Sequence, residues 1–150
     1  MQKQIDIKNK KAFFEFEFLD KFSAGMMLTG TEIKSVRLGN VNMNDAWCYF
    51  SKGDLFVKNL NISAYEKGTH YNHEPLRPRK LLLKKRELEK LQTKIKEKGL
   101  TIIPTRVFLS ERGLAKMEVA LAKGKKLHDK RQSIKERDAK RDLQKITRSR

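Results

Sequence analysis

Apolar and polar residues alternate along several short stretches of the chain, and this period of two is typical of strands that bury one face. Residues 13–18 (Phe-Phe-Glu-Phe-Glu-Phe) predict such a strand, with alternate phenylalanines on the buried side. Residues 115–121 show the same alternation, with Ala, Met, Val and Leu on one side. The apolar segments 47–50 and 55–57 flank a loop of hairpin length, so they predict a β-hairpin.

Two other segments have the period of an amphipathic helix. Thr29 and Glu32 have the spacing of an N-terminal capping box, and Gly39 can end the helix that follows. Residues 84–98 place leucine and isoleucine side chains three and four positions apart on one face, and Gly99 comes next. Both segments are therefore predicted to be helices.

The segment 100–109 is apolar and β-branched, and Pro104 within it favours a sheet edge or a bulge. Short strands, glycine-containing turns and two modest helices predict a mainly β protein with short helices, built on an OB-type antiparallel β-barrel. The sequence changes character near Gly124, because nearly every second residue beyond it is charged. We therefore expect an OB-type body over residues 1–123 and a basic C-terminal tail over residues 124–150.

Positive charge is concentrated in two blocks of the chain. The 150 residues include 35 Lys and Arg against 18 Asp and Glu, a formal net charge of +17. Residues 77–98 hold 10 basic and 3 acidic residues, a net of +7, and residues 123–150 hold 12 and 4, a net of +8. Since a compact domain of this charge repels itself, the pattern indicates a polyanionic partner. Nucleic acid is favoured over an acidic membrane surface or an acidic protein.

The tail has too few apolar residues to bury a core of its own. It is nevertheless rich in Lys, Arg, Glu and Gln, which are good helix formers. We predict that the tail is disordered when free and helical when it lies along an anionic partner. Contacts between its cations and phosphates also predict an affinity that falls steeply with salt.

Side chains that usually carry catalysis are scarce or badly spaced. His70 and His73 lie close together but have no cysteine or carboxylate at ligand spacing, so no metal site is predicted. We see no phosphate-binding glycine loop and no nucleophile elbow, and expect neither an enzyme nor a cofactor. Cys48 is the single cysteine, so no disulfide framework is possible and a reducing compartment is expected. Its apolar neighbours indicate that it is a core residue. With no signal peptide and no apolar run near ~20 residues, the expected protein is soluble and cytoplasmic, without membrane contact.

RNA recognition also requires flat groups that stack on unpaired bases. The chain has 8 Phe, 3 Tyr and 1 Trp, and most lie in the alternating segments, where a place in the core is the simpler interpretation. Tyr65 and Tyr71 lie beside a polar turn and are better candidates for stacking. His128 lies within a run of charged residues and is the most suggestive planar group of the chain.

Four stretches, in the same order, resemble the SsrA-binding protein family, also called small protein B. They are residues 9–12, residues 28–37 with Gly39, residues 77–83, and residues 124–131 with residues 135–138. The resemblance extends from Asn9 to about Arg141, while Ile33 and Val36 replace other aliphatic residues and the last ten residues match loosely. Members of this family bind transfer-messenger RNA (tmRNA) in bacterial trans-translation.

The resemblance implies an OB-type body that docks on the tRNA-like domain of tmRNA and stands where an anticodon stem would be. It also implies a tail that occupies the empty mRNA channel near the decoding centre of a stalled ribosome. The expected partners are tmRNA, the small-subunit rRNA of the ribosome, and elongation factor Tu on alanylated tmRNA. The protein is expected to act as a monomer.

The same resemblance assigns the site residues. Those expected to bind tmRNA are Asn9, Glu32, Lys34, Arg37, Arg79, Lys80, Leu82, Gly124, Lys125 and Lys126. Those expected to meet the ribosome near its decoding centre are His128, Asp129, Lys130, Arg131, Lys135 and Arg137. Lys130 and Arg131 would hold rRNA phosphates, and His128 would stack near the decoding bases.

Glu32 has two interpretations. A carboxylate repels phosphate but can accept a hydrogen bond from a base edge, which would give selectivity rather than affinity. From the residues alone, capping of the helix is the better interpretation, whereas the resemblance favours RNA docking. Leu82 could likewise be an ordinary core residue.

Two other functions fit a basic chain of this kind: a structural ribosomal protein whose tail threads rRNA, and a sequence-blind binder of single strands. A structural component stays with ribosomal subunits in high salt, whereas an adaptor washes off. A sequence-blind binder would show no preference for a folded tRNA shape. A nuclease is a more distant alternative, which labelled RNA incubated with Mg²⁺ would reveal.

Overall fold

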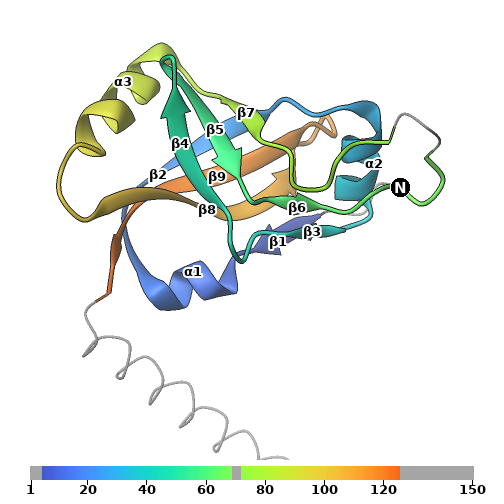
Figure 1. Cartoon of the computed structure of the whole chain (residues 1–150), viewed down its shortest axis with the longest axis horizontal. Helices are drawn as coiled ribbons and strands as arrows, with labels where there is room; N and C mark the ends of the chain where they lie inside the picture. Colours follow the sequence, from blue (N-terminus) through green and yellow to red (C-terminus); the bar gives the residue numbers. More distant parts are fainter. Residues whose placement is uncertain (1–4, 69–71, 126–150) are drawn as a thin grey trace, which may run out of the picture.

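A computed structural model of the chain describes residues 5–68 and 72–125, and Figure 1 shows the arrangement of the elements. Within these residues the protein is mainly β. The strands are β1 (Asp6–Lys8), β2 (Phe16–Met26), β3 (Val41–Asn42), β4 (Trp47–Ser51), β5 (Asp54–Lys58), β6 (Asn61–Ile62), β7 (Arg79–Leu82), β8 (Leu100–Leu109) and β9 (Ala115–Gly124). The helices are α1 (Lys10–Glu15), α2 (Gly30–Arg37) and α3 (Lys85–Lys94).

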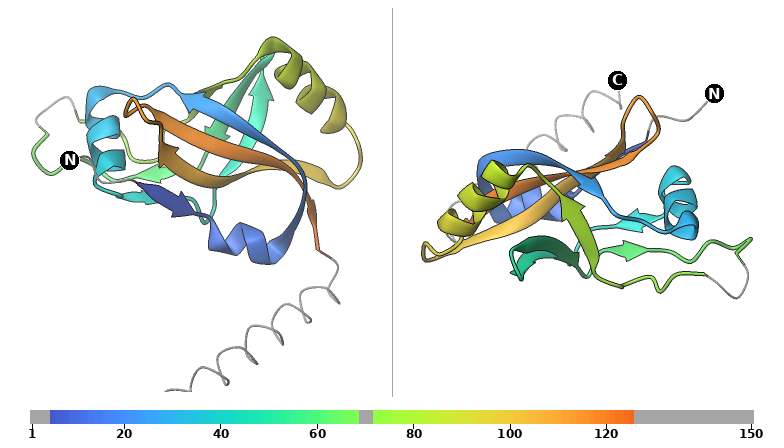
Figure 2. Two further views of the ribbon diagram at one scale, coloured as in Figure 1. Left: turned by 180° about the vertical axis from the view of Figure 1, so that it is seen from behind. Right: turned by 90° about the horizontal axis from the view of Figure 1, so that it is seen from above.

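The larger sheet closes on itself into a barrel. Its neighbouring strands follow the order β8-β4-β5-β7-β2-β9, and β9 pairs in turn with β8, so the ring is complete. All of these pairs are antiparallel, and the two views in Figure 2 show the strands curving around a common interior. β1 extends the ring by pairing with β8, while β3 and β6 form a separate ribbon. The predicted mainly β, OB-type barrel is thus confirmed.

Two places in the ring are joined by few backbone pairs. β2 meets β7 only at Gly25–Leu82 and Met26–Leu81, and β4 meets β8 only at Cys48–Ile102. β2 and β9, by contrast, pair along almost their whole length. We call the first of these places the β2–β7 seam, and it lies where β2 leads into α2.

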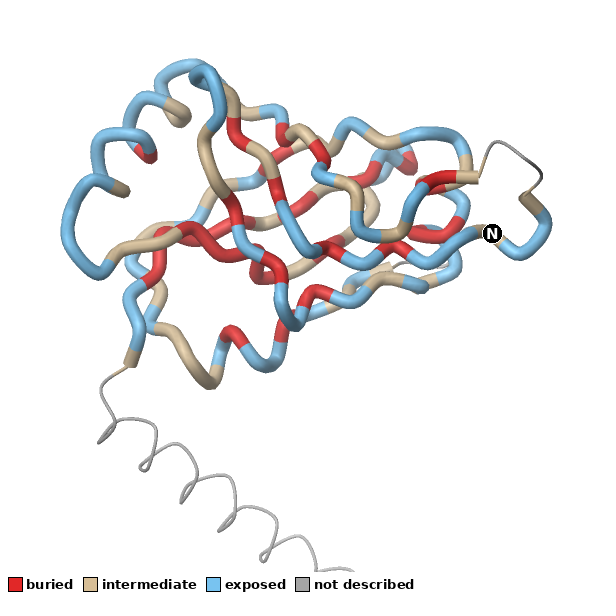
Figure 3. The backbone as a smooth tube through the Cα atoms, viewed as in Figure 1, coloured by how far each residue is buried: buried red, intermediate tan, exposed pale blue. Residues whose placement is uncertain are grey.

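Side chains on the inner side of the ring form one apolar core, and Figure 3 marks in red the buried residues along the strands. Val57, Met117 and Val119 are completely buried there. α3 lies at one end of the barrel, where Leu91 enters the same core. A helix that covers the end of a small barrel in this way removes apolar surface that the strands alone would leave exposed.

β4 and β5 form the predicted hairpin. Trp47 lies opposite Lys58 and Ser51 opposite Asp54, and the turn between them consists of Lys52 and Gly53. Both turn residues have positive φ angles, 51° and 83°, as a type I′ turn requires. This turn matches the natural twist of antiparallel strands and fixes which residues of both strands face outward.

The predicted strand over residues 13–18 is wrong in its first half. Those residues belong to α1, and β2 begins only at Phe16. The cause lies just upstream, where the Asn9 side chain caps α1 by accepting a hydrogen bond from the Ala12 amide at 3.2 Å. Ala12 is then buried against the outer side of β8 and β9, so a cap and a tertiary contact override the local alternation.

The two predicted helices are confirmed, although α3 is shorter than expected. α2 follows Thr29 and has the predicted capping box. α3 ends at Lys94 rather than near Lys98, because turns and Gly99, with a φ angle of 83°, lead directly into β8. The register of β8 shifts just after Pro104, so the predicted bulge is also confirmed.

The described body continues to the last residues of β9. β9 ends at Gly124, and the Lys125 amide donates to the Glu15 carbonyl at 3.0 Å. The boundary expected after residue 123 stays a prediction, as do the disorder and the helix formation of the tail, because residues 126–150 lie outside the described residues.

Candidate nucleic-acid interface

A buried carboxylate holds two arginines at the start of α2. The Glu32 side chain has 0% exposure, and so has Arg79, which reaches it from β7. Arg79 donates from Nε to Glu32 Oε2 at 2.5 Å, and Arg77 donates from Nη2 to Glu32 Oε1 at 2.5 Å. The Thr29 amide also donates to Oε1, at 2.9 Å. Both carboxylate oxygens are therefore occupied, and we call the side chains of Glu32, Arg77 and Arg79 the Glu32 cluster.

The Glu32 carboxyl is held in its ionised form. Burial alone would raise its pKa, but hydrogen bonds from Arg77, the Thr29 amide and Arg79 outweigh burial and lower the pKa below its ordinary value. A buried charge is tolerated only when it is paired, so the cluster ties α2 to β7 across the β2–β7 seam.

The two arginines of the cluster differ in their access to solvent. Arg79 also donates to the Leu60 carbonyl at 2.5 Å and to the Glu74 carbonyl at 3.3 Å, and it is completely buried. Arg77 keeps 35% of its side chain exposed while Glu32 orients its guanidinium. Arg77, which we did not single out from the sequence, is therefore the arginine that can meet a phosphate, and Arg79 is not.

The hypothesis that Glu32 accepts a hydrogen bond from a base edge does not fit this geometry. The carboxylate has no exposed atom, and protein donors already bond both of its oxygens. The capping interpretation agrees with the Thr29 contact, and the ion pairs add a second structural role. Glu32 can therefore affect RNA binding through the position of Arg77 and through its ion pair with Arg79.

Asn9 is also buried rather than free to meet RNA. Only 2% of it is exposed, and its Nδ2 donates to the Pro104 carbonyl at 2.8 Å and to the Met43 carbonyl at 3.3 Å. Together with its cap on the Ala12 amide, these bonds tie α1 to β8. The expected direct contact between Asn9 and tmRNA does not fit this burial.

Replacing Asn9 by alanine is expected to lower the free energy of unfolding by ~2–3 kcal/mol, since a helix cap is lost and buried carbonyls lose their donor. Urea unfolding of the full chain measures this. The matched control is Asn44→Ala, because Asn44 is exposed. The control should stay within ~0.5 kcal/mol of the unmodified protein, and equal losses in both variants would contradict the structural role of Asn9.

Two adjoining grooves lie on the outer side of the β2–β7 seam. The first, of about 560 Å³, is lined by Met26, Met27, Leu28, Thr29, Phe56, Arg77, Pro78 and Lys80. The second, of about 420 Å³, is lined by Gly25, Met26, Leu28, Ile33, Leu82, Leu114, Ala115 and Lys116. Both grooves are apolar at the base with cationic side chains beside them, which suits contacts to sugars and bases as well as phosphates. We call the two grooves together the seam surface.

Several predicted RNA-binding residues lie on the seam surface. Leu82 is 50% exposed, so it is not a core residue. Lys80 lies two positions before it on the same side of β7, with 38% of its side chain exposed and an ion pair to Asp54 at 3.5 Å. Leu82 and Lys80 are therefore available to a partner together with Arg77, whereas Asn9, Glu32 and Arg79 support the surface from beneath.

The other predicted residues are divided among separate places. Lys34 and Arg37 are exposed on α2, where the Lys34 ammonium lies 5.4 Å from the ring centre of Tyr65. Gly124 and Lys125 lie at the end of β9, opposite the beginning of β2. The remaining tail residues lie outside the described residues: Lys126, His128, Asp129, Lys130, Arg131, Lys135 and Arg137. Tyr71, the second stacking candidate, is outside them as well.

The seam surface and the residues at the start of the tail lie at opposite ends of β2. The seam surface begins at Gly25, while Gly124 pairs with Phe16, nine residues earlier on the same strand. At about 3.3 Å per residue, ~30 Å of strand separates the two positions. The tail therefore leaves the body far from the seam surface.

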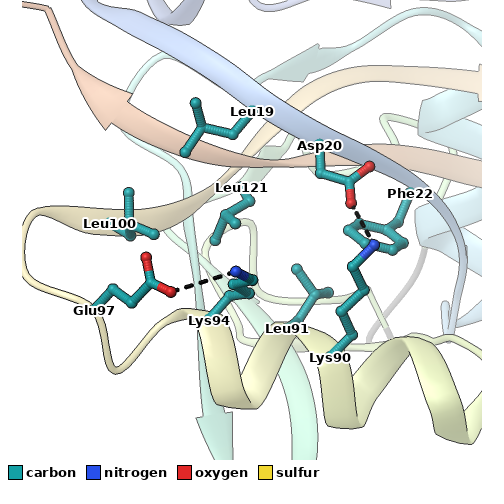
Figure 4. A pocket seen from close by; sticks show the side chains of 9 residues that line it. All are labelled: Leu19, Asp20, Phe22, Lys90, Leu91, Lys94, Glu97, Leu100 and Leu121. Carbon is teal, nitrogen blue, oxygen red and sulfur yellow. Dashed lines mark hydrogen bonds and ion pairs between the residues drawn. The ribbon is translucent and has the colours of Figure 1, made fainter.

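A further cavity, of about 390 Å³, lies between α3 and the barrel (Figure 4). Leucines from β2, β8, β9 and α3 line it, and ion pairs lie beside them, with Lys90 bound to Asp20 at 2.9 Å and Lys94 bound to Glu97 at 3.4 Å. The Lys90–Asp20 pair joins α3 to β2, so the cavity belongs to the packing of the helix on the barrel.

The one histidine and the one cysteine of the described residues, His73 and Cys48, have structural roles. His73 donates from Nε2 to the Ile62 carbonyl at 2.8 Å, and its Nδ1 bonds the Thr31 hydroxyl at 2.8 Å. Cys48 is buried, and burial raises the pKa of its thiol. Residues 5–68 and 72–125 contain no cluster of three or more metal-ligating side chains. None of the helices in this part is long and apolar enough to cross a membrane.

A closed antiparallel barrel with a helix at one end, a groove flanked by cations and a strongly basic sequence defines an OB-type nucleic-acid-binding protein. Comparison with known proteins identifies the family within this class. Residues 6–149 match the family described as SmpB protein, and the chain belongs to this family.

Relatives match over almost the whole chain. The SsrA-binding protein of Cytophaga hutchinsonii is 58% identical over 144 residues, which are 96% of this chain and 94% of the relative. The SsrA-binding protein of Bacteroides thetaiotaomicron is 55% identical, covering 95% of each chain. A solved structure described as "tmRNA-SmpB: a journey to the center of the bacterial ribosome" is similar with a TM-score of 0.71 and 41% identity, over 86% of this chain and 94% of that one.

Proposed function

We propose that the chain binds tmRNA through its barrel and delivers it to stalled ribosomes for trans-translation, as an RNA-binding adaptor and not as an enzyme. The names of the relatives, the similar structure of tmRNA with SmpB and the basic sequence support this function. The protein then works in the cytoplasm, where ribosomes translate, with elongation factor Tu on alanylated tmRNA as a further partner.

The observation that best supports this function is that the seam surface and the start of the tail lie at opposite ends of β2. They are separated by ~30 Å of strand, at about 3.3 Å per residue. A body that binds a folded RNA at one end can therefore offer the tail to a second partner at the other end. The tail residues from His128 to Arg137 contact the decoding centre and the mRNA channel in this proposal.

On the body, the seam surface receives the tRNA-like domain. Leu82 supplies apolar contact, and Lys80 and Arg77 neutralise phosphates. Glu32 and Arg79 act as positioning residues, because their ion pair holds the groove together from inside the barrel.

A competition assay tests the function. The labelled RNA is the tRNA-like domain of tmRNA, and the competitor is an alanine tRNA of similar size, at ~0.15 M salt, where non-specific phosphate binding is already weakened. We expect a strong preference for the tmRNA domain. Equal affinity for both RNAs would mean that only charge is recognised, and would overturn the proposal.

The same assay tests the seam surface. Leu82→Ser is expected to weaken binding of the tmRNA domain about tenfold, the effect of ~1.4 kcal/mol at a central interface residue. The matched control is Leu19→Ser, because Leu19 is 51% exposed against 50% for Leu82 and lies beside α3 instead. If both variants bind as tightly as the unmodified protein, RNA docks elsewhere on the body.

A further inference from the structure

Three aromatic rings form a row on the outer side of the β4–β5 hairpin. Tyr49 and Phe56 face each other across the two strands, with ring centres 5.8 Å apart and planes inclined by 22°. Trp47 lies on the other side of Tyr49, with ring centres 5.5 Å apart. The planes of Trp47 and Tyr49 are inclined by 50°, so the three side chains form a row of neighbouring rings, which we call the aromatic row.

The row faces solvent, not the core. The residues next to its members along the two strands point inward and are buried: Cys48 at 1%, Leu55 at 0% and Val57 at 0% exposure. Trp47 is 39% exposed, and Tyr49 and Phe56 are half-buried. Polar residues would serve equally well on the solvent face of a hairpin, so three large aromatic side chains there indicate a partner that covers them.

The surroundings of the row are cationic. Lys58 pairs with Trp47 across the hairpin and holds its ammonium 6.0 Å from the indole ring centre. Lys80 lies opposite Phe56 on β7, so it stands at the other end of the row. One carboxylate, Asp54, is paired with Lys80. Stacking surfaces flanked by lysines are the combination with which proteins hold unpaired nucleotides, because rings take the bases and cations take the phosphates.

The row is also continuous with the seam surface. Phe56 and Lys80 adjoin each other at the end of the row and at the same time line the first groove, next to Arg77. A nucleic acid that occupies this groove therefore has the aromatic row within reach of its next nucleotides. A protein partner would not require the lysines at both ends.

We propose that the aromatic row is a stacking site for unpaired bases of the RNA that binds the seam surface. This inference rests on the proposed function for the identity of the RNA, and it adds the chemistry of recognition. The ring faces of Trp47, Tyr49 and Phe56 take bases that protrude from the folded RNA, while Lys58 and Lys80 hold the adjoining phosphates.

Trp47 is the single tryptophan of the chain, so its fluorescence reports on the row directly. We expect the fluorescence of the full-length protein to be quenched when the tRNA-like domain of tmRNA is added, since a stacked base quenches indole emission. Tyr49→Leu and Phe56→Leu keep the reporter and an apolar side chain but remove a ring. Each is expected to reduce the quenching and to weaken RNA binding about tenfold, within the range for one lost base–aromatic stack.

Phe13→Leu is the matched control, because Phe13 is 43% exposed and packs edge-on against Phe18 on a different part of the body. It should leave both affinity and quenching unchanged. Melting temperatures of all variants separate binding from folding, because cross-strand aromatic pairs also stabilise a hairpin. Lower melting temperatures with unchanged affinity per folded molecule would show that the row is structural, and would overturn the inference.

Failure of the proposed function gives a different pattern. In that case the tmRNA domain binds no better than alanine tRNA, whatever the variant. The row is then probed with a single-stranded oligouridine against a duplex of the same length. Quenching by the single strand that Tyr49→Leu reduces upholds the stacking site, and the absence of quenching by any of these RNAs overturns it.

Discussion

Replacing Glu32 by alanine is expected to lower the free energy of unfolding by ~3–5 kcal/mol, the usual cost of removing one partner from a buried ion pair. The substitution leaves the Arg79 guanidinium completely buried without its counter-ion, and Arg77 without the group that orients it. It also removes the acceptor of the Thr29 amide at the start of α2. Chemical denaturation of the full chain measures the loss.

Two controls separate this effect from a general cost of removing charge. Asp20→Asn removes an ion pair from a carboxylate that is 39% exposed, and it should cost less than ~1 kcal/mol. Glu32→Gln keeps the shape of the side chain but not its charge, and it should be nearly as harmful as alanine. If both Glu32 variants lost little free energy of unfolding but much RNA affinity per folded molecule, the result would instead support a direct contact between Glu32 and RNA.

The same ion pairs predict how stability depends on pH. Because the pKa of Glu32 is lower in the folded protein than in the unfolded chain, the unfolded state binds its proton first as the pH falls. The stabilisation by Glu32 is therefore fully present above the unfolded pKa of about 4.3 and is lost as the pH falls through the lower folded pKa. Glu32→Gln should unfold with a flatter dependence on pH over this acidic range, and an identical slope in both proteins would contradict a contribution from the ionised Glu32 carboxylate.

Glu32 also shows how far the sequence alone could reach. Its spacing from Thr29 is local, so the start of α2 could be predicted from the residue types that cap helices. Its ion pairs join it to residues 45 and 47 positions away, and no pattern within a helix contains that information. Direct readout of a base by Glu32 therefore stays a prediction, and one that the burial of its side chain, a tertiary property, does not favour.

The aromatic row could not be predicted from the sequence for a related reason. Along β4 and β5 both faces are apolar, so the alternation does not tell which face the barrel encloses. Closure of the ring decides it, placing Cys48 and Val57 inside and Trp47 and Phe56 outside. Sequence reasoning predicted the hairpin and its turn, because turn chemistry is local, but it assigned most of the aromatic side chains to the core.

Deletion of residues 129–150 is expected to leave the affinity for the tRNA-like domain of tmRNA within about twofold while abolishing tagging of proteins on stalled ribosomes. The deleted segment carries nine basic and four acidic residues, a net charge of +5. The tail leaves β9 beside the beginning of β2, at the other end of that strand from the seam surface. A reconstituted translation reaction on a message without a stop codon measures tagging, and filter binding measures affinity.

A variant with residues 129–150 shuffled keeps the length and the net charge of the tail. It therefore distinguishes a need for particular side chains at particular positions from a need for positive charge alone. If the tail works by placing particular side chains in the mRNA channel, the shuffled chain binds tmRNA normally and still fails to tag. If it supplies only diffuse attraction to rRNA, the shuffled chain tags normally at low salt and loses activity as salt rises. Leu82→Ser should show the converse defect, a weaker affinity for the tRNA-like domain of tmRNA. If the deletion and Leu82→Ser each reduced RNA affinity and tagging to the same extent, the body and the tail would not have separate tasks.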